Sequence, residues 1–392
     1  MSLRRIDCGI IPLVDSAALV VARELGFAAE EGLDLQLHVE RSWSAIRDKL
    51  ALGRLDAAHM LAPVPIAMSM GLGGMAMPLD ALMVLSVNGN VVGVSRQLAE
   101  KMRDNGMPND FMAAERIGRA LVGVCPRPLR IGVPFPFSMH AELLYYWLEA
   151  LGLRAPQELD VRTVPPPLMV EAMAAGEIDA FCVGEPWGSV AVEKGVAELI
   201  LPCCAIWRFA PEKVLAVRRG WAEREVEATA ALMRAVWRAA RWLSDPSRPM
   251  TASEILARES YLNVAPEVIE RTLLGRILVS STSEEKEAPR FIEFLDGAAT
   301  FPWRSQAVWI ANRLARRNGL DRAEAAAIAR RCFRPDLYRE YLSALGVDMP
   351  GASEKLEGSL SARMPVASST GDMFLGPDTF FDAKVFDSTD PD

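Results

Sequence analysis

At the start of the chain, apolar and polar positions follow two periods in turn. Alternating or short unbroken apolar runs predict strands, and apolar stripes at helical spacing that stop at a glycine predict the helices between them. The predicted elements are strand 5–11, helix 16–25, strand 33–39, helix 44–52 and strand 57–60. This order forms a βαβαβ unit and indicates an α/β protein.

The same unit occurs a second time. Its predicted elements are strand 129–133, helix 140–151, strand 159–164, helix 168–175 and strand 180–183. Gly9 matches Gly132 and Asp56 matches Asp179, and each pair is separated by 123 positions (132 − 9 and 179 − 56). The glycines at 53 and 176 have the same offset, so we infer an internal duplication. Two α/β lobes of one design predict a cleft that closes on a small ligand.

The segment between the two units is expected to connect the lobes. Residues 82–87 and 91–95 predict a strand pair joined by Asn88-Gly89-Asn90, a sequence that could be no more than a hairpin turn. The polar stretch 96–119 is then expected to carry the chain across to the second lobe.

The rest of the chain predicts a return strand at 213–217 and a helical region from 222 to about 347 that packs on the first lobe. The final residues are rich in Ser, Pro, Gly and Asp, which predicts an irregular arm. The expected domains are lobe I at 1–95 and 214–350, lobe II at 96–213, and an extended tail at 351–392.

Length and charge narrow the class of protein. With 392 residues, the chain exceeds the size at which one core usually stops growing, so two or three domains are expected. A formal net charge of −8 without a clustered basic patch argues against direct nucleic-acid binding. The longest apolar stretches are interrupted, for example by Pro63 and Pro65, and predict no membrane span.

The cysteine content and the position of the first predicted strand predict the cellular compartment of the protein. Six cysteines without Cys-x-x-Cys spacing favour a reducing compartment. The first predicted strand begins within a few residues of Met1, which leaves no room for the apolar core of a signal peptide. We therefore expect a cytoplasmic protein. The alternative is a periplasmic or membrane-anchored protein whose signal has been removed from the sequence.

Candidate ligand-binding side chains stand in loops next to the predicted strands, where open α/β sheets bind their ligands. Trp43 precedes a helix and offers a flat wall with one N–H donor, although a lone tryptophan is about as often part of a core. His140 opens a helix, where a protonated imidazole could face an anion or the residue could be structural. Lys213 precedes an apolar strand, and taken alone it is more typical of a solvated lysine.

Enzyme signatures are largely missing. The three histidines, His38, His59 and His140, do not form a metal-binding set, and there is no Walker loop, nucleophile elbow or Gly-x-Gly-x-x-Gly after a strand. Asp15, Ser16 and His59 could be imagined as a triad, but nothing in the sequence supports that geometry. We expect a binding protein with no catalytic residue, no metal and no cofactor, and a small anion is the natural ligand of helix N-termini.

Short motifs spread over nearly the whole chain carry a family resemblance. They include Gly9-Ile10-Ile11-Pro12-Leu13-Val14-Asp15, Ser42-Trp43, Leu55-Asp56-Ala57-Ala58-His59-Met60, Asn88-Gly89-Asn90, His140, Gly184-Glu185-Pro186-Trp187, Lys213, Thr300-Phe301-Pro302-Trp303 and Phe380-Phe381-Asp382. Together they resemble the nitrate- and bicarbonate-binding proteins of nitrate-type ABC transporters. The resemblance implies a type II periplasmic-binding-protein fold, with two α/β lobes, a ligand cleft and additional C-terminal helices.

The resemblance also implies an oxyanion pocket formed by Trp43, Asn90, His140 and Lys213. A cation at Lys213 suits nitrate or nitrite, whereas bicarbonate-binding relatives are acidic at this place. Asn90 departs from the nitrate transporters' pattern, in which glutamine follows the glycine, and this departure puts its reach to the ligand in question. The residues expected in the cleft beside the pocket are Asp15, Asn88, Gly89, Ser138, Glu185 and Trp187.

Three roles compete. We expect a cytoplasmic nitrate/nitrite sensor that holds an RNA-binding antiterminator inactive until the anion arrives, because an acidic chain suits a basic regulator. The alternative is the solute-binding component of a nitrate-type ABC importer, which works with permease and ATPase subunits. The third role is an enzyme on the same fold, as in thiamin-pyrimidine synthesis, which would need a cluster of His and Cys that this chain does not supply.

Overall fold

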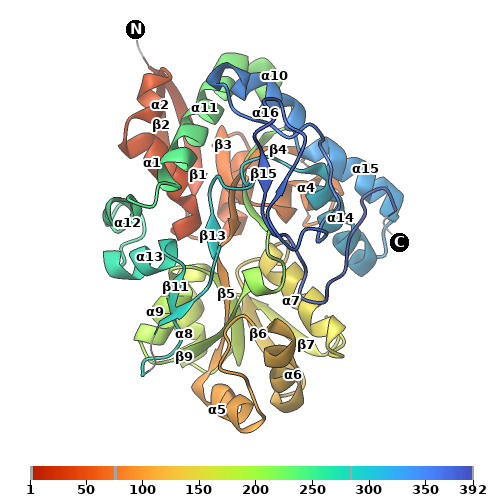
Figure 1. The fold of residues 1–392 in the computed structure, drawn as a ribbon. Coiled ribbons are helices and arrows are strands. Elements are labelled where there is room, and N and C mark those ends of the chain that lie inside the picture. Colours follow the sequence, from red (N-terminus) through yellow and green to blue (C-terminus); the bar gives the residue numbers. More distant parts are fainter. Residues whose placement is uncertain (1–2, 75–76, 283–284, 391–392) are drawn as a thin grey trace.

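The computed structural model describes residues 3–74, 77–282 and 285–390, and in them the chain forms two lobes, each built on its own sheet (Figure 1). The strands of the first sheet are β1 (Arg4–Ile10), β2 (Leu33–Val39), β3 (Ala57–Leu61), β4 (Leu79–Asn88), β10 (Pro211–Arg218) and β13 (Ile292–Glu293). The strands of the second sheet are β5 (Asn90–Ser95), β6 (Leu129–Val133), β7 (Leu159–Thr163), β8 (Ala180–Gly184) and β9 (Ala197–Pro202).

The two sheets have the same plan, which confirms the predicted duplication. The first has the order β13-β4-β10-β3-β1-β2 and the second has the order β9-β5-β8-β6-β7. In each sheet the three strands of the βαβαβ unit are parallel, and one inserted strand, β10 or β5, runs antiparallel to both of its neighbours.

The repeated aspartates have a structural role that is the same in both lobes. The backbone N–H of Asp7 donates to Asp56 Oδ2 at 3.0 Å, and the backbone N–H of Arg130 donates to Asp179 Oδ2 at 3.2 Å. Each carboxylate therefore fastens the start of the unit's third strand to its first strand. The duplicated motif belongs to the frame of each lobe and not to the ligand site.

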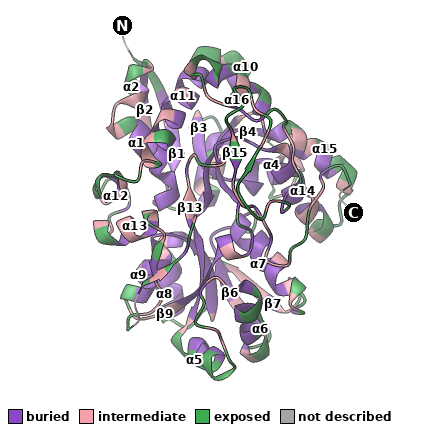
Figure 2. Ribbon diagram, in the orientation of Figure 1, coloured by how far each residue is buried: buried purple, intermediate pink, exposed green. Residues whose placement is uncertain are grey.

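Helices cover both sheets and leave their strands buried (Figure 2). The first lobe carries α1 (Ala17–Glu24), α2 (Phe27–Glu30), α3 (Trp43–Ala51) and α4 (Pro63–Ser69), and the second carries α5 (Arg96–Asp104), α6 (Ala114–Val124), α7 (Met139–Ala150), α8 (Met169–Ala174) and α9 (Trp187–Glu193). The later helices are α10 (Trp221–Arg224), α11 (Val226–Leu243), α12 (Pro249–Leu256), α13 (Pro266–Leu273), α14 (Arg304–Asn318), α15 (Arg322–Cys332) and α16 (Pro335–Leu342). Single turns of 3₁₀ helix are η1 (Val14–Ser16), η2 (Pro166–Leu168), η3 (Cys203–Ala205) and η4 (Ser343–Leu345).

The predicted strand pair around Asn88-Gly89-Asn90 is wrong. β4 ends at Asn88 in the first sheet and β5 begins at Asn90 in the second, so the chain passes from one lobe to the other at Gly89. Asn88 and Gly89 have φ values of 62° and 98°, a left-handed pair that turns the chain sharply. The Asn-Gly signal is local and does not specify which strands pair.

The lobe boundaries move with this crossing point. Residues 90–95 lie in the second sheet, although the expected boundary placed them in lobe I, and 211–213 lie in the first sheet, although it placed them in lobe II. The stretch 96–119 does not cross between lobes. It contains α5 and the start of α6, and both helices pack on β9 of the second sheet.

The C-terminal helices pack on the first lobe, as predicted, with α14 and α15 against α4, and α16 against β4 and α11. The region is not continuously helical. Between α13 and α14 the chain forms β11 (Arg276–Leu278), β12 (Glu285–Glu287) and β13, which pairs with β4 at the edge of the first sheet. No helix in the described part of the chain is long and apolar enough to cross a membrane.

The tail is largely irregular, as predicted, with one small pair of strands, β14 (Met364–Pro365) and β15 (Phe374–Leu375). It runs over the first lobe towards α7 (dark blue in Figure 1). Phe380 stacks on Trp207 with ring centroids 4.7 Å apart, and Tyr146 Oη of α7 donates to Asp382 Oδ1 at 2.7 Å. The tail therefore contacts both lobes.

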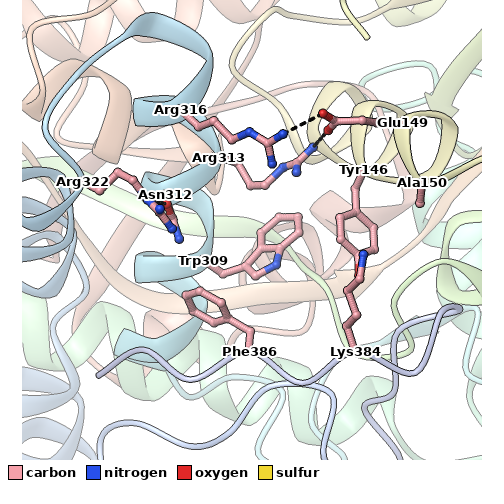
Figure 3. A pocket seen from close by; sticks show the side chains of 10 residues that line it. All are labelled: Tyr146, Glu149, Ala150, Trp309, Asn312, Arg313, Arg316, Arg322, Lys384 and Phe386. Carbon is pink, nitrogen blue, oxygen red and sulfur yellow. Dashed lines mark hydrogen bonds and ion pairs between the residues drawn. The ribbon is translucent and has the colours of Figure 1, made fainter. Parts of the chain in front are cut away.

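A group of ion pairs, here called the interlobe clasp, joins α14 of the first lobe to α7 of the second. Glu149 binds Arg316 at 2.9 Å and Arg313 at 3.5 Å, and Glu142 binds Arg317. Figure 3 shows Arg313 and Arg316 reaching across to Glu149 above a cavity of about 480 Å³.

Candidate ligand-binding site

The two lobes touch where the loops after β1 and β8 face each other. The backbone N–H of Val14 donates to the Glu185 carbonyl at 2.9 Å, and Trp187 Nε1 donates to the Pro12 carbonyl at 2.9 Å. Behind these contacts lies a group of buried polar side chains that we call the interlobe polar cluster. Its members are Asp15, Trp43, His59, Asn90, His140, Glu212 and Lys213, and each is at most 2% exposed.

The structure brings together all four residues that were predicted to form the pocket. Trp43 is the first residue of α3 and Lys213 lies on β10, so both come from the first lobe. Asn90 is the first residue of β5 and His140 the second residue of α7, so both come from the second lobe. A ligand held by these four side chains would contact both lobes.

Lys213 lies at the centre of the cluster. Its Nζ is 2.7 Å from Asp15 Oδ2 and 2.8 Å from Glu212 Oε1, and it lies 5.6 Å from the centre of the Trp43 ring. Burial alone would lower the pKa of Lys213, but the charges of Asp15 and Glu212 outweigh it and raise that pKa, so the lysine is a cation.

The two carboxylates differ in their electrostatic setting. Burial would raise the pKa of Asp15, but the charge of Lys213 at 2.7 Å and the close approach of His59 at 3.0 Å lower it to about 2. For Glu212, burial dominates and raises the pKa, although the charge of Lys213 opposes it. Asp15 is therefore ionised near neutral pH, whereas Glu212 holds a proton more readily than an exposed glutamate.

Both histidines of the cluster are neutral. Burial lowers the pKa of His59, whose Nδ1 accepts from the Ile11 N–H at 3.5 Å and whose Nε2 lies 3.0 Å from Asp15 Oδ1. Burial and the nearby charge of Lys213 lower the pKa of His140 well below its usual value. The expectation of a protonated imidazole at His140 is therefore not supported, and His140 offers one donor and one acceptor.

Several buried polar atoms of the cluster have no hydrogen-bond partner. Among the described residues they are Trp43 Nε1, both side-chain polar atoms of Asn90, both ring nitrogens of His140, and Glu212 Oε2. The Asp15 carboxylate oxygens and His59 Nε2 also lack an aligned hydrogen bond, but they lie at ion-pair distance from Lys213 or from each other. A buried polar group without a partner costs roughly 1–3 kcal/mol, so such atoms gathered in one place indicate a site for a ligand. The indole N–H, the amide N–H₂ and the Lys213 ammonium are donors, which suit a small oxyanion.

The residues expected beside the pocket mostly serve the frame of the site. Asn88 Nδ2 donates to the carbonyls of Arg208 and Arg290, and its Oδ1 accepts from the Ala210 N–H, so it fixes the crossing between lobes. Gly89 supplies the turn there. Ser138 caps α7 by accepting from the Ala141 N–H at 3.2 Å.

Glu185 and Trp187 belong to the contact between the lobes. Trp187 donates to Pro12 of the opposite lobe, and Glu185 Oε2 accepts from the Ser189 N–H at 3.1 Å while its buried Oε1 has no partner. Burial raises the pKa of Glu185 to about 7.

The imagined triad is not formed. Ser16 Oγ donates to the Leu13 carbonyl at 2.8 Å instead of to His59. Among the described residues there is also no group of three or more His, Cys, Asp or Glu side chains placed to hold a metal ion.

Sequence reasoning missed Glu212 as a member of the site. Residues 212 and 213 are neighbours on a strand, and regular alternation would point them to opposite faces of the sheet. Around Lys213 the register with β4 is irregular, a β-bulge that turns both side chains to the same side. Bulges are not visible in the apolar pattern, but a carboxylate beside a predicted pocket lysine was a signal that could have been weighed.

The sequence is similar to proteins of one class. The model of the NMT1-like family matches residues 2–257. The nitrate/nitrite binding protein NrtA of Synechococcus elongatus is 30% identical over 398 residues, covering 98% of this chain and 84% of that protein. The nitrate import ATP-binding protein NrtC of Synechocystis sp. is 34% identical over 344 residues, covering 87% of this chain and 50% of that protein. This chain thus spans about half the length of NrtC.

The fold has a solved counterpart. The crystal structure of the periplasmic nitrate-binding protein NrtA from Synechocystis PCC 6803 matches with a TM-score of 0.85 and 27% sequence identity, covering 99% of this chain and 97% of that chain. The predicted periplasmic-binding-protein fold and the predicted resemblance are therefore confirmed.

Proposed function

The chain belongs to the NMT1-like family, and on that premise we propose that it binds nitrate or nitrite as the solute-binding component of an ABC importer. Its relatives NrtA are nitrate/nitrite binding proteins by name, which supports a binding protein in preference to an enzyme. The ligand would lie between the lobes, against Trp43, Asn90, His140 and Lys213.

One observation carries this proposal. A buried ammonium, an indole N–H and an amide N–H₂, contributed by both lobes, converge in the interlobe polar cluster, and the indole and amide donors have no partner. A planar monovalent oxyanion can accept from all of them. Because two of the four side chains come from each lobe, such a ligand would stabilise the closed arrangement of the lobes.

The importer role has more support than the sensor role. NrtC, an ATP-binding protein of nitrate import by name, is similar to this chain over half of its own length, which supports partnership with permease and ATPase subunits. No observation supports an antiterminator partner or the expected cytoplasmic location. With the importer role we propose a location outside the cytoplasmic membrane, where such a receptor meets its solute.

Calorimetric titration with nitrate, nitrite, bicarbonate and sulfate tests the ligand. We expect one molecule of nitrate or nitrite to bind per chain, with weaker binding of bicarbonate and none of sulfate, because a second negative charge is not compensated in the cluster. Ser138→Ala provides a control, because it changes the cap of α7 without removing a donor from the cluster. Tighter binding of sulfate than of nitrate, or no binding of nitrate and nitrite, would contradict the proposal.

A pull-down with purified candidate partners separates the two roles. An importer receptor should bind its permease and ATPase subunits more strongly when nitrate is present. A sensor should bind an antiterminator in the absence of nitrate and release it when nitrate is added, because partner and ligand must weaken each other's binding by the same factor.

A further inference from the structure

Glu212 is placed to control which anions the interlobe polar cluster accepts. Its Oε1 lies 2.8 Å from Lys213 Nζ and 3.2 Å from His140 Nδ1, so one oxygen contacts both the cation and the histidine. The side chain is 0% exposed, and its Oε2 is buried without a hydrogen-bond partner. A buried carboxylate in this position is unexpected in a site for anions, because an ionised glutamate would repel them.

The other groups that face Glu212 have settled charges near neutral pH. They are Lys213 of β10, a cation; Asp15 of η1, an anion; His140 of α7, neutral; the uncharged Asn90 amide of β5; and the buried thiol of Cys203 in η3, whose pKa is raised well above its usual value. The charge of the cluster before a ligand binds therefore depends on Glu212. It is one negative charge with Glu212 ionised and zero with Glu212 protonated.

The proton on Glu212 also determines what His140 can donate. His140 Nδ1 lies 3.2 Å from Glu212 Oε1 without the alignment of a hydrogen bond. If Glu212 is ionised, its negative oxygen favours the imidazole proton on Nδ1, which leaves Nε2 as an acceptor that repels an oxyanion. If Glu212 is protonated, its O–H can donate to Nδ1. The imidazole proton then lies on Nε2, which has no hydrogen-bond partner among the described residues and can donate to a ligand oxygen.

We propose that Glu212 is the specificity-determining residue of the site, and that an acceptor-only oxyanion such as nitrate or nitrite binds together with one proton that Glu212 takes up from solvent. No bond to the anion forms or breaks. The solvent proton joins the Glu212 carboxylate, the existing imidazole proton moves to Nε2 of His140, and the charge of the cluster rises by one as the anion adds one negative charge. This inference rests on the proposed function.

The proposal predicts the direction of the pH dependence. A bound anion raises the pKa of Glu212 further, so binding is tighter at low pH. Above the pKa of Glu212 in the free protein, nitrate affinity should fall by up to about tenfold per pH unit. An anion that carries its own O–H, such as bicarbonate, can donate to an unprotonated Nε2 and should lose less affinity as the pH rises.

Nitrate titration calorimetry between pH 6 and 9, repeated in two buffers of different ionisation enthalpy, tests the proposal. The difference between buffers should correspond to uptake of a fraction of a proton that approaches one per nitrate at the higher pH values. Glu212→Gln, which keeps the shape and removes the charge, should bind nitrate with nearly constant affinity over this range and more tightly than the wild type at pH 9.

Two further variants assign the effect to Glu212. Asp15→Asn also removes a negative charge beside Lys213, but it should keep the pH dependence and move it to lower pH, because the charge of Asp15 raises the pKa of Glu212. His140→Gln should weaken binding and keep proton uptake. Nitrate binding without proton uptake, or an unchanged slope in Glu212→Gln, would overturn this inference and leave the proposed function intact. Failure of nitrate and nitrite to bind at any pH would overturn both.

Discussion

Two ion pairs near the contact between the lobes, Lys213–Asp15 of the interlobe polar cluster and Arg316–Glu149 of the interlobe clasp, differ mainly in burial. In the cluster, the side chains of Lys213 and Asp15 are 0% and 2% exposed, whereas in the clasp those of Arg316 and Glu149 are 66% and 36% exposed. The distances within the pairs are similar, 2.7 Å and 2.9 Å. The separation between charges therefore does not distinguish a site from a surface contact.

The difference in burial changes what each charge does. In the clasp, water competes for every exposed group, and such pairs contribute roughly 0–1 kcal/mol. In the cluster, each charge needs its partner, and a monovalent ligand changes the balance of the whole group. Oppositely charged pairs hold the two lobes together in the clasp, and in the cluster they lie within the first lobe at the place where we propose that the ligand binds.

The largest expected effect tests whether the cluster depends on its one lysine. Lys213→Met leaves Asp15 and Glu212 buried without their cation, so we expect a loss of about 3–5 kcal/mol in the free energy of unfolding together with the loss of nitrate binding. Urea unfolding followed by circular dichroism measures the first effect and calorimetry the second.

The matched control for Lys213→Met removes the carboxylates as well. The triple variant Lys213→Met, Asp15→Asn, Glu212→Gln should recover most of the stability and none of the binding. If Lys213→Met alone had the same free energy of unfolding as the wild type, the ion pairs of the cluster would contribute less to stability than their burial implies.

A smaller effect is expected from one donor of the cluster. Trp43→Phe keeps an aromatic ring and removes the indole N–H, and it should weaken nitrate binding by about 1.5–3 kcal/mol, the range for hydrogen bonds to charged groups. Trp237→Phe is the control, because Trp237 is also a buried tryptophan but lies on α11, outside the cluster. If the two variants bound nitrate with equal affinity, the indole N–H of Trp43 would not donate to the ligand.

Acid should affect the cluster through Asp15. Its pKa is about 2 in the folded protein and about 3.9 in an unfolded chain, so its contribution to stability is present above pH 4 and is lost as the pH falls towards 2. The size is about 2.6 kcal/mol. Unfolding measured between pH 2 and 5 should show a smaller loss in Asp15→Asn than in the wild type, and identical losses would contradict this assignment.

The smallest effect is expected from the exposed Arg316–Glu149 pair of the clasp. Arg316→Ala should change the free energy of unfolding by less than about 1 kcal/mol, and salt should reduce that change further. Arg317→Met should cost more, because Glu142 is 0% exposed and would lose its cation. Urea unfolding of both variants at low and high salt measures the difference. A larger loss of stability in Arg316→Ala than in Arg317→Met would contradict the conclusion that burial determines the contribution of an ion pair.

For most helices and strands of the duplicated units, both ends could be predicted from the sequence to within about two residues. Apolar periodicity and glycine stops are local signals, and strands such as β2 and β6 depend on little else. The crossing at Gly89 could not be predicted in the same way. Strand pairing is decided by tertiary contacts, and Asn-Gly suggested a hairpin where the chain changes lobes.

The site was predicted unevenly for a similar reason. Trp43, Asn90, His140 and Lys213 were named from a family resemblance, and no property of the residues taken singly separated Lys213 from a solvated lysine. Glu212 was missed because only the bulge in β10 brings it to the same side as Lys213. The neutral state of His140 depends on burial and on a charge distant in sequence, which periodicity does not reveal.

The inserted antiparallel strands have a consequence for the order in which the two sheets can form during synthesis. All five strands of the second sheet lie in one continuous stretch, residues 90–202, and can pair as soon as that stretch has left the ribosome. The first sheet must wait for β10, which lies between β3 and β4 and is synthesised only after the whole second lobe. The half of the molecule that is translated first is therefore the last to close, and until then the edges of β3 and β4 wait for a strand that has not yet been made.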